Sequence, residues 1–450
     1  MVNRSLVLSD AYATACDATD EGVFSTEHGS QNTTISLGGQ VGKIPEFMFA
    51  SLPLTSIIIP ATVTEISNDA FTNCDKLTSV IFEEGAETLT IGYNTIGDDE
   101  GLFAESPLTS VALFRKINYT FPNPNTASEG LFGNKETLTS IVIGNNVTEL
   151  LPYMFANSAA TSFDLKQVTT IGEAALMGAD FTDLTIPACV TSIGNYAFAD
   201  CENLANLTIA SGARDLTIGF QPGSDEHGPF YQSPLKSIKI NRPIAMTSEY
   251  NTNCDQWDEG IFSNEYYNDN VDWTTDLVLG PNVKTILKYM FAGTRIQQLH
   301  IPETVDNIGV NVIENNEKLN AIIFYDEKVR PNVEIGAFGT SSTGIEMDWE
   351  HLDPSIEAYP PGKYQYYVFV PLRQGRNFNT LYHSDEELQK YTYWDDLQAI
   401  MVDDMPGRYN YYQSHEVDDR HHESRYLDVP GYEWYRKRYY NQETIMPPVF

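Results

Sequence analysis

The sequence has few cysteines, and it lacks long apolar runs. Its five cysteines are scattered over 450 residues, which excludes a disulfide framework. Cys74 and Cys201 each lie three residues after a phenylalanine of a repeated motif, which predicts small buried side chains rather than redox chemistry. No apolar run approaches the roughly 20 residues that span a bilayer, so no membrane insertion is expected.

Basic residues are also scarce. The chain has 27 Lys and Arg against 62 Asp and Glu, for a formal net charge of −35. Binding to nucleic acid needs a basic stripe against the phosphates, and an anionic membrane surface has the same need, so neither partner is expected. The charge suits the solubility of an extended molecule that must not self-associate.

The first 22 residues lack a basic start followed by an apolar stretch, so we expect no secretory signal in this chain. Either a signal was trimmed before Met1, or the protein is not exported by that route. The first case predicts an extracellular or cell-surface location, and the second leaves a virion as the alternative.

What the sequence does contain is a repeat. A motif of the form LTSIxIPxxVTxIGxxAFxxCxxL recurs between about residues 35 and 345, with a period near 22 residues. A fixed period of this length predicts a chain built by stacking one small unit, and such chains are usually binding surfaces. A lone unit buries too little apolar surface to fold, so neighbouring units must stabilise each other.

Alternation within each motif predicts a strand. Ile57 and Ile59 lie two positions apart, as do Leu184 and Ile186, so both members of each pair point into the core. Pro60, Pro187 and Pro302 should end their strands, Gly194 and Gly309 should permit a tight turn, and a phenylalanine should then fill the core. The predicted inward pairs include Ile141 with Ile143 and Phe163 with Leu165. The predicted outward row reads Ile58, Ile81, Ala112, Val142, Asp164, Thr185, Thr208, Lys239, Val278, His300 and Ile323.

Longer units interrupt the regular spacing, and a block of them returns after 127 residues. Residues 89–111 match residues 216–238 at this offset, which indicates duplication of several units together. The insertions at 97–101, 119–129, 222–228 and 243–260 should project from one edge and are candidate contact surfaces. Asp98, Asp99 and Asp225 lie in equivalent insertions. Neither insertion has the ligand spacing of a calcium loop, so solvated acidic tips are expected.

These motifs, above all residues 59–80 and 186–207, resemble the BspA-type leucine-rich repeat family of bacterial surface proteins. The resemblance covers residues from about 35 to 400. It implies a mainly β repeat solenoid with a parallel sheet, short helical or 3₁₀ turns, a right-handed coil and a C-terminal cap. It also implies adhesion or recognition, with no catalytic residues. The expected domains are an N-terminal capping segment (1–34), the solenoid (35–345), the cap (346–401) and a tail (402–450).

The tail of 49 residues differs from the solenoid in charge and composition. It contains eight tyrosines, nine acids and six bases, so it is nearly neutral. Tyrosine, tryptophan and arginine are residues that interfaces favour. The tail could pack on its own chain, dock on another subunit, or stay disordered. Its candidate contact residues are Trp434, Arg436, Arg438, Tyr439 and Tyr440.

No constellation for catalysis, metal or cofactor binding is recognisable, so we expect a protein that is not an enzyme and uses no cofactor. The leading hypothesis is recognition of a protein or glycan partner through the sheet face and insertion loops. The alternative is a structural subunit of a larger assembly, such as a bacteriophage virion, docked through its tail. The candidate contacts on the sheet face are Ile58, Ile81, Val142, Asp164, Lys239 and His300. The N-terminal segment or the tail could instead cover the aliphatic residues among them.

Overall fold

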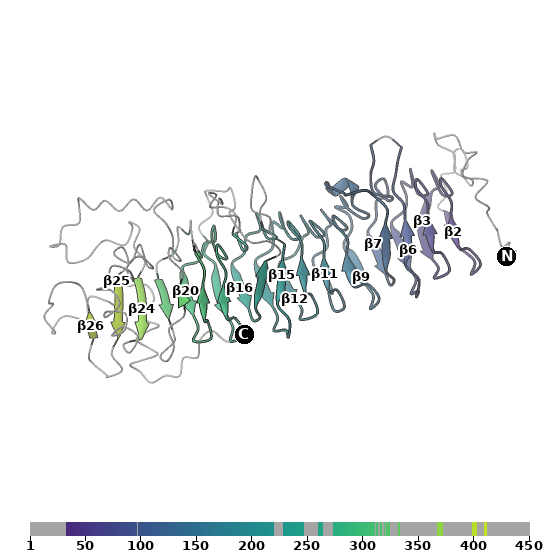
Figure 1. Ribbon diagram of the computed structural model, residues 1–450. Helices are drawn as coiled ribbons and strands as arrows, with labels where there is room; N and C mark the ends of the chain where they lie inside the picture. The colour runs from purple at the N-terminus through teal and green to yellow at the C-terminus, as the bar shows by residue number, and fades with distance from the viewer. Residues whose placement is uncertain are drawn as a thin grey trace. The chain divides into compact units, whose positions relative to one another are not determined.

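The computed structural model (Figure 1) describes most of residues 33–324 and short segments beyond. The described residues are 33–96, 98–219, 228–246, 260–263, 273–310, 312–313, 316, 319, 321–324, 332–333, 367–371, 398–402 and 409–411. They divide into two units. Unit 1 holds those up to Leu204 together with 217–219 and 229–233, and unit 2 holds the remainder.

Unit 1 is built from parallel strands that follow each other from rung to rung. Its first sheet has the order β1 (Thr33–Ile35), β3 (Leu54–Ile59), β5 (Ser79–Phe82), β7 (Ser110–Leu113) and β9 (Ser140–Ile143). The second short strands pair as β2 (Lys43–Ile44), β4 (Glu65–Ile66), β6 (Leu89–Ile91) and β8 (Ile117–Tyr119). A further sheet of short strands contains β10 (Glu149–Leu150), β11 (Thr170–Ile171), β13 (Ser192–Ile193) and β15 (Leu216–Ile218). Unit 1 also contains β12 (Asp183–Ile186) and the 3₁₀ helix η2 (Ala127–Glu129).

Unit 2 repeats the parallel arrangement. One sheet contains β14 (Asn206–Ile209), β16 (Ser237–Ile240) and β18 (Asp276–Leu279). Another runs β20 (Gln298–Ile301), β22 (Ala321–Phe324), β24 (Tyr367–Pro371), β25 (Gln398–Val402) and β26 (Tyr409–Tyr411). The short strands are β17 (Ile244–Met246), β19 (Thr285–Ile286), β21 (Asn307–Ile308) and β23 (Asn332–Val333). The strand β26, from the start of the predicted tail, pairs antiparallel with β25.

The alternation predicted from the sequence sets the core. Ile57, Val80 and Val111 are Cα partners on successive strands, and all three are buried. Beneath the strands, Phe49, Phe71, Phe103, Phe132 and Phe155 form a column with ring centroids 5.1–5.5 Å apart. All eight phenylalanines predicted to fill the core are buried: Phe71, Phe103, Phe132, Phe155, Phe198, Phe230, Phe262 and Phe291.

The predicted strand at Phe163 and Leu165 is wrong. Residues 162–165 form no strand, and the first sheet of unit 1 stops at β9. The spacing from the last inward residue to its counterpart among the short strands varies between rungs: it is seven from Ile59 to Ile66, nine from Phe82 to Ile91 and six from Leu113 to Tyr119. Leu165 also lies six before Ile171, so the length of the connection does not explain the missing strand. The short strand β11 nevertheless keeps its register with β10 and β13.

The interruption also changes the neighbouring rung. Val111 and Leu113 of β7 are buried, as predicted for inward positions, whereas Ile141 and Ile143 of β9 are only half-buried. The missing strand therefore leaves the side of β9 that would face a sixth strand of this sheet incompletely covered.

The tight turns do not depend on the predicted glycines for their left-handed backbone. Positive φ falls two residues later, at non-glycine positions such as Tyr196 (53°) and, one rung earlier, Ala174 (48°). Gly194 has a different role. A Cβ there would lie 2.6 Å from the backbone nitrogen of Glu173 on the preceding rung, so glycine is required for close contact between rungs.

The predicted duplication is visible in buried cations. Arg115 in unit 1 and Arg242 in unit 2, separated by the 127-residue offset, are both 0% exposed. The guanidinium of Arg115 donates to the carbonyl oxygens of Pro60, Ala61 and Glu87, at 3.3, 3.3 and 3.0 Å. Burial lowers the pKa of Arg115, an effect that Glu87 opposes. The side chain thus stabilises loop carbonyls of adjacent rungs that no strand pairing satisfies.

Candidate functional site

The most continuous apolar feature on the described surface is a row of side chains on the first sheet of unit 1. Ile58, Ile81, Ala112 and Val142 are Cα partners across four parallel strands. Ile58 is 49% and Val142 45% exposed, while Ile81 and Ala112 between them are half-buried. Neighbouring strands are about 4.8 Å apart, so the row is about 14 Å long. Hydroxyl groups line the same strands, because Ser56, Ser79, Ser110 and Ser140 form a second row in register.

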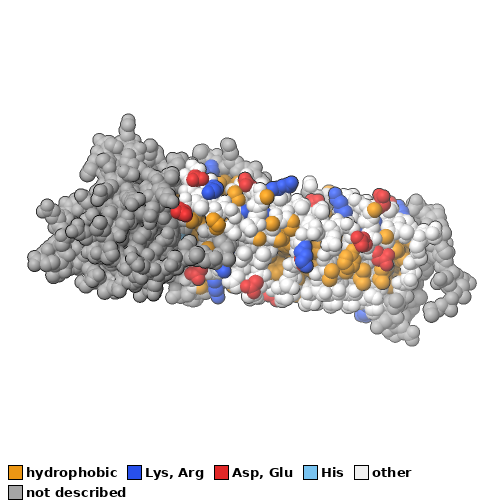
Figure 2. Space-filling model, turned by 90° about the horizontal axis from the view of Figure 1, so that it is seen from below, with side chains coloured by type: hydrophobic (Ala, Val, Ile, Leu, Met, Phe, Trp, Pro, Cys, Tyr) orange, Lys and Arg blue, Asp and Glu red, His pale blue; other side chains and the backbone are white. Residues whose placement is uncertain are grey.

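We call these two rows the outer face of unit 1. Its edge is held by threonines: Thr78 Oγ1 donates to the carbonyl of Thr55 at 3.0 Å, and Thr109 Oγ1 donates to that of Thr78 at 3.2 Å. On the side of the molecule drawn in Figure 2, hydrophobic side chains gather toward the N-terminal end of the described residues, with acidic side chains beside them. An aliphatic row on a fixed sheet is a pre-formed contact surface.

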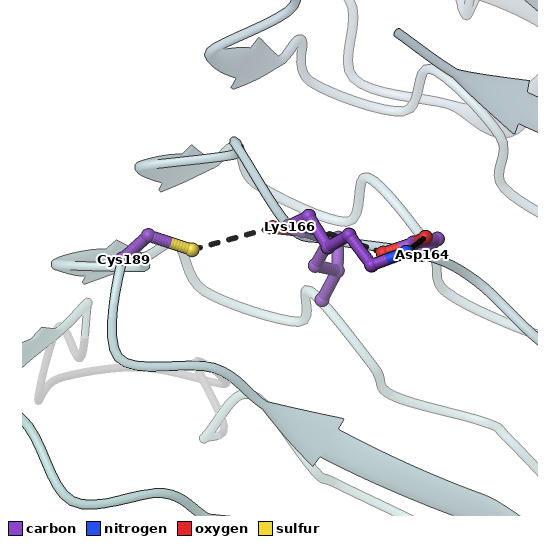
Figure 3. A network of polar contacts seen from close by, with 4 residues as sticks. Asp164, Lys166 and Cys189 are labelled. Carbon is purple, nitrogen blue, oxygen red and sulfur yellow. Dashed lines mark hydrogen bonds and ion pairs between the residues drawn. The ribbon is translucent and has the colours of Figure 1, made fainter. Parts of the chain in front are cut away.

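Beyond Val142 the predicted outward row does not continue on a strand. Asp164 is exposed, but it lies in the irregular segment rather than on a strand. Its carboxylate pairs with Lys166 Nζ at 2.6 Å (Figure 3), and this hydrogen bond lowers the pKa of Asp164. In the same view, Cys189 Sγ donates to the carbonyl of Leu165 at 3.4 Å. Asp164 is thus a paired surface acid at the interruption of the sheet.

In unit 2 the corresponding positions are mostly polar. Thr208, Lys239 and Val278 are Cα partners, and all three are half-buried. His300 pairs in register with Ile323, and its Nε2 lies 3.2 Å from Gln298 Oε1. Burial lowers the pKa of His300 to about 4, so the imidazole is neutral at physiological pH. Only unit 1 therefore presents an aliphatic row among the described residues.

The two insertions of unit 1 come together in space. Asn94 and Glu100 exchange backbone hydrogen bonds of 2.9 and 3.1 Å, which close the first insertion into a hairpin that carries the exposed Asp98 and Asp99. The backbone nitrogen of Gly101 donates to the carbonyl of Ser128 in the second insertion at 2.8 Å. Both insertions are evident in the sequence, but no sequence signal brings together the half-buried rings of Tyr93 and Phe121, whose centroids lie 4.8 Å apart.

Several predicted contacts lie outside the described residues. They are Asp225, Trp434, Arg436, Arg438, Tyr439 and Tyr440.

The described residues contain no group of three or more His, Cys, Asp and Glu side chains placed to hold a metal ion. They also contain no helix that is long and apolar enough to cross a membrane. Cys74 and Cys201 are buried, as predicted, and burial raises the pKa of each thiol to about 12.

This fold, with parallel strands stacked rung on rung and a phenylalanine in the core of most rungs, defines a leucine-rich repeat solenoid. The family model for the BspA type leucine rich repeat region matches residues 21–124, 125–254 and 223–320, in six copies. The chain belongs to that family, as its sequence motifs indicated. The family and the fold point to a non-catalytic protein.

Solved structures with similarity to the chain are distant. A leucine-rich repeat protein from Bacteroides ovatus is 15% identical, with a TM-score of 0.38 over 80% of this chain and 88% of that one. A leucine rich cell surface protein from Faecalibacterium prausnitzii is 19% identical, with a TM-score of 0.24 over 65% and 80%. The pneumococcal vaccine antigen PcpA is 13% identical, with a TM-score of 0.32 over 82% and 86%. Among curated proteins, none matches the chain.

Proposed function

We propose that this protein is a non-enzymatic recognition protein, displayed outside the cell, that binds a protein partner through the outer face of unit 1. One observation carries the proposal: Ile58, Ile81, Ala112 and Val142 form one aliphatic row, exposed at Ile58 and Val142 and half-buried between them, on four strands that already pair with one another. Because the strands are fixed, binding would order few additional groups, and most of the apolar contact would contribute to affinity.

The surroundings of the row define the partner further. Glu83 and Glu84 follow β5 and are exposed, and Asn146 Nδ2 donates to Glu84 Oε1 at 3.1 Å. A partner that suits this face would place apolar side chains on the aliphatic row, polar groups on the serine row, and basic residues near the two glutamates. Membership of a family of bacterial surface proteins supports display outside the cell.

The test measures binding of the purified full chain to a panel of purified extracellular-matrix and mucosal proteins by surface plasmon resonance. We expect a saturable partner whose affinity falls about tenfold or more in the double variant Ile58→Asn/Val142→Asn, because a desolvated apolar contact becomes polar. The matched control is Ile96→Asn, which changes an aliphatic side chain that is 42% exposed on the first insertion instead of the sheet.

Two outcomes would count against the proposal. One is the absence of any saturable partner in the panel, and the other is a partner bound equally well by the wild type and the double variant. Circular dichroism of both variants shows whether the repeat fold is retained, so that loss of binding is not confused with unfolding.

A further inference from the structure

The two insertions of unit 1 build a second surface, separate from the sheet. Residues 93–96 and 98–101 belong to the hairpin that carries the first insertion, and residues 119–129 form the second insertion, with Gly130 directly after it. They are joined by the hydrogen bond from Gly101 to Ser128 and by the contact between the rings of Tyr93 and Phe121. Segments that are separate in the sequence therefore form one surface, which we call the loop patch.

Three aromatic rings lie at the centre of the loop patch. The ring of Phe121 packs edge-on against Tyr93 at 4.8 Å and stacks on Tyr119 at 6.0 Å. All three side chains are half-buried, so part of the aromatic surface is open to solvent. Tyr119 anchors the cluster from below, because its hydroxyl donates to the carbonyl of Glu129 at 2.7 Å.

The second insertion is held rigidly around these rings. The carboxylate of Glu129 accepts hydrogen bonds from the backbone nitrogens of Asn125 and Thr126, at 2.6 and 3.3 Å. Pro122 and Pro124 flank the exposed Asn123 and restrict the backbone further. A ligand would meet rings and amides that are already in position, so binding would cost little conformational entropy.

The polar side chains of the loop patch are either uncharged or acidic. Asn123, Asn125, Asp98 and Asp99 are exposed, and neither insertion contains a lysine, arginine or histidine. Lys135 is close enough to Glu100 for their charges to interact, but it is buried and donates to the carbonyl of Ala104. The loop patch therefore offers no exposed cation of its own to an anionic ligand, and its carboxylates would repel one.

We propose that the loop patch binds an uncharged saccharide, with a sugar ring placed over Phe121 and Tyr93. The C–H face of a pyranose is apolar and flat enough to pack on aromatic rings, while its hydroxyl groups need donors and acceptors around the rim. Asparagine amides supply both, and the aspartates supply acceptors. This inference rests on the proposed recognition function and adds a second ligand class at a second site.

The experiment is isothermal titration of the full chain with chitotetraose and mannotetraose as uncharged probes and sialyllactose as the acidic probe. We expect one uncharged probe to bind and sialyllactose not to bind. Phe121→Leu keeps an apolar side chain in the cluster but removes the ring, and it should weaken binding tenfold or more. The Asp98→Asn/Asp99→Asn variant should retain the uncharged probe and bind sialyllactose more tightly than the wild type does.

The control Ile58→Asn/Val142→Asn should bind the saccharide as the wild type does, because its substitutions lie on the sheet. If neither uncharged probe binds, or if Phe121→Leu binds unchanged, the saccharide site is refuted. If the wild type binds no saccharide and the Phe121→Leu variant no longer binds an immobilised protein partner, the loop patch is instead a protein-contact surface. If only the Ile58→Asn/Val142→Asn variant loses affinity for a protein partner, the proposed function holds whether or not a saccharide binds the loop patch.

Discussion

At the scale of single residues, the contacts between rungs decide which positions tolerate change. Residues that look alike in the sequence differ in what surrounds them. A Cβ added to Gly38 would have no atom within 4 Å. A Cβ added to Gly194 would lie 2.6 Å from the backbone nitrogen of Glu173 and 2.8 Å from the carbonyl carbon of Gly172. The atoms close to Gly194 belong to the main chain, which cannot move aside without displacing a whole rung.

We therefore expect Gly194→Ala to destabilise the fold by about 1–3 kcal/mol through overpacking. Gly38→Ala is the matched control, and it should change the free energy of unfolding by less than about 0.5 kcal/mol. Urea denaturation followed by circular dichroism measures both. Equal midpoints for the two variants would show that the rungs can separate locally, contrary to the close packing described above.

At the scale of an element, an apolar pattern does not by itself determine whether a strand forms. Residues 162–165 carry the expected pattern, with Leu165 buried, yet they form no strand. The short strands β10, β11 and β13 keep their register, while the first sheet of unit 1 stops at β9. The length of the connection does not decide this case, because Leu165 and Ile171 have the same six-residue spacing as Leu113 of β7 and Tyr119 of β8.

Because residues 162–165 form no strand, we expect their amides to exchange with solvent faster than those of β7, which pairs with β5 and with β9. Hydrogen exchange of the full chain, followed by mass spectrometry, measures both segments. Equal protection of the two segments would contradict the interruption of the sheet after β9.

At the scale of the whole molecule, charge is the dominant property. A formal net charge of −35 on 450 residues repels itself in the folded state, and the sequence pI of about 4.4 places the least charged form in mild acid. The ion pairs of Lys43 with Glu65, Lys76 with Asp75 and Lys166 with Asp164 lie at the surface, where each contributes little against this repulsion.

Raising sodium chloride from about 10 mM to about 100 mM shortens the screening length from about 30 Å to about 10 Å, so the midpoint of urea denaturation should rise. An uncharged solute of equal osmolarity serves as the control, because it leaves electrostatic repulsion unscreened. A midpoint that salt leaves unchanged, or lowers, would show that the acidic side chains are too far apart to destabilise the fold.

Much of the fold was determined by the sequence alone. The period near 22 residues, the alternation of Ile57 with Ile59, and the recurring phenylalanines depend on local spacing, which the sequence displays directly. The same spacing placed Ile58, Ile81 and Val142 on one outward row, which the strand register confirms. Acidic insertion tips at Asp98 and Asp99 were found in the same way.

Only the tertiary structure decided the remainder. It showed that the strand after β9 is missing, that Asp164 pairs with Lys166, and that Gly194 is needed for contact between rungs and not for its backbone angle. It also brought Tyr93 and Phe121 together from two insertions. The physical reason is common to these cases: each depends on the distance between neighbouring rungs, and that distance is set by how stacked turns fit together rather than by spacing within one repeat.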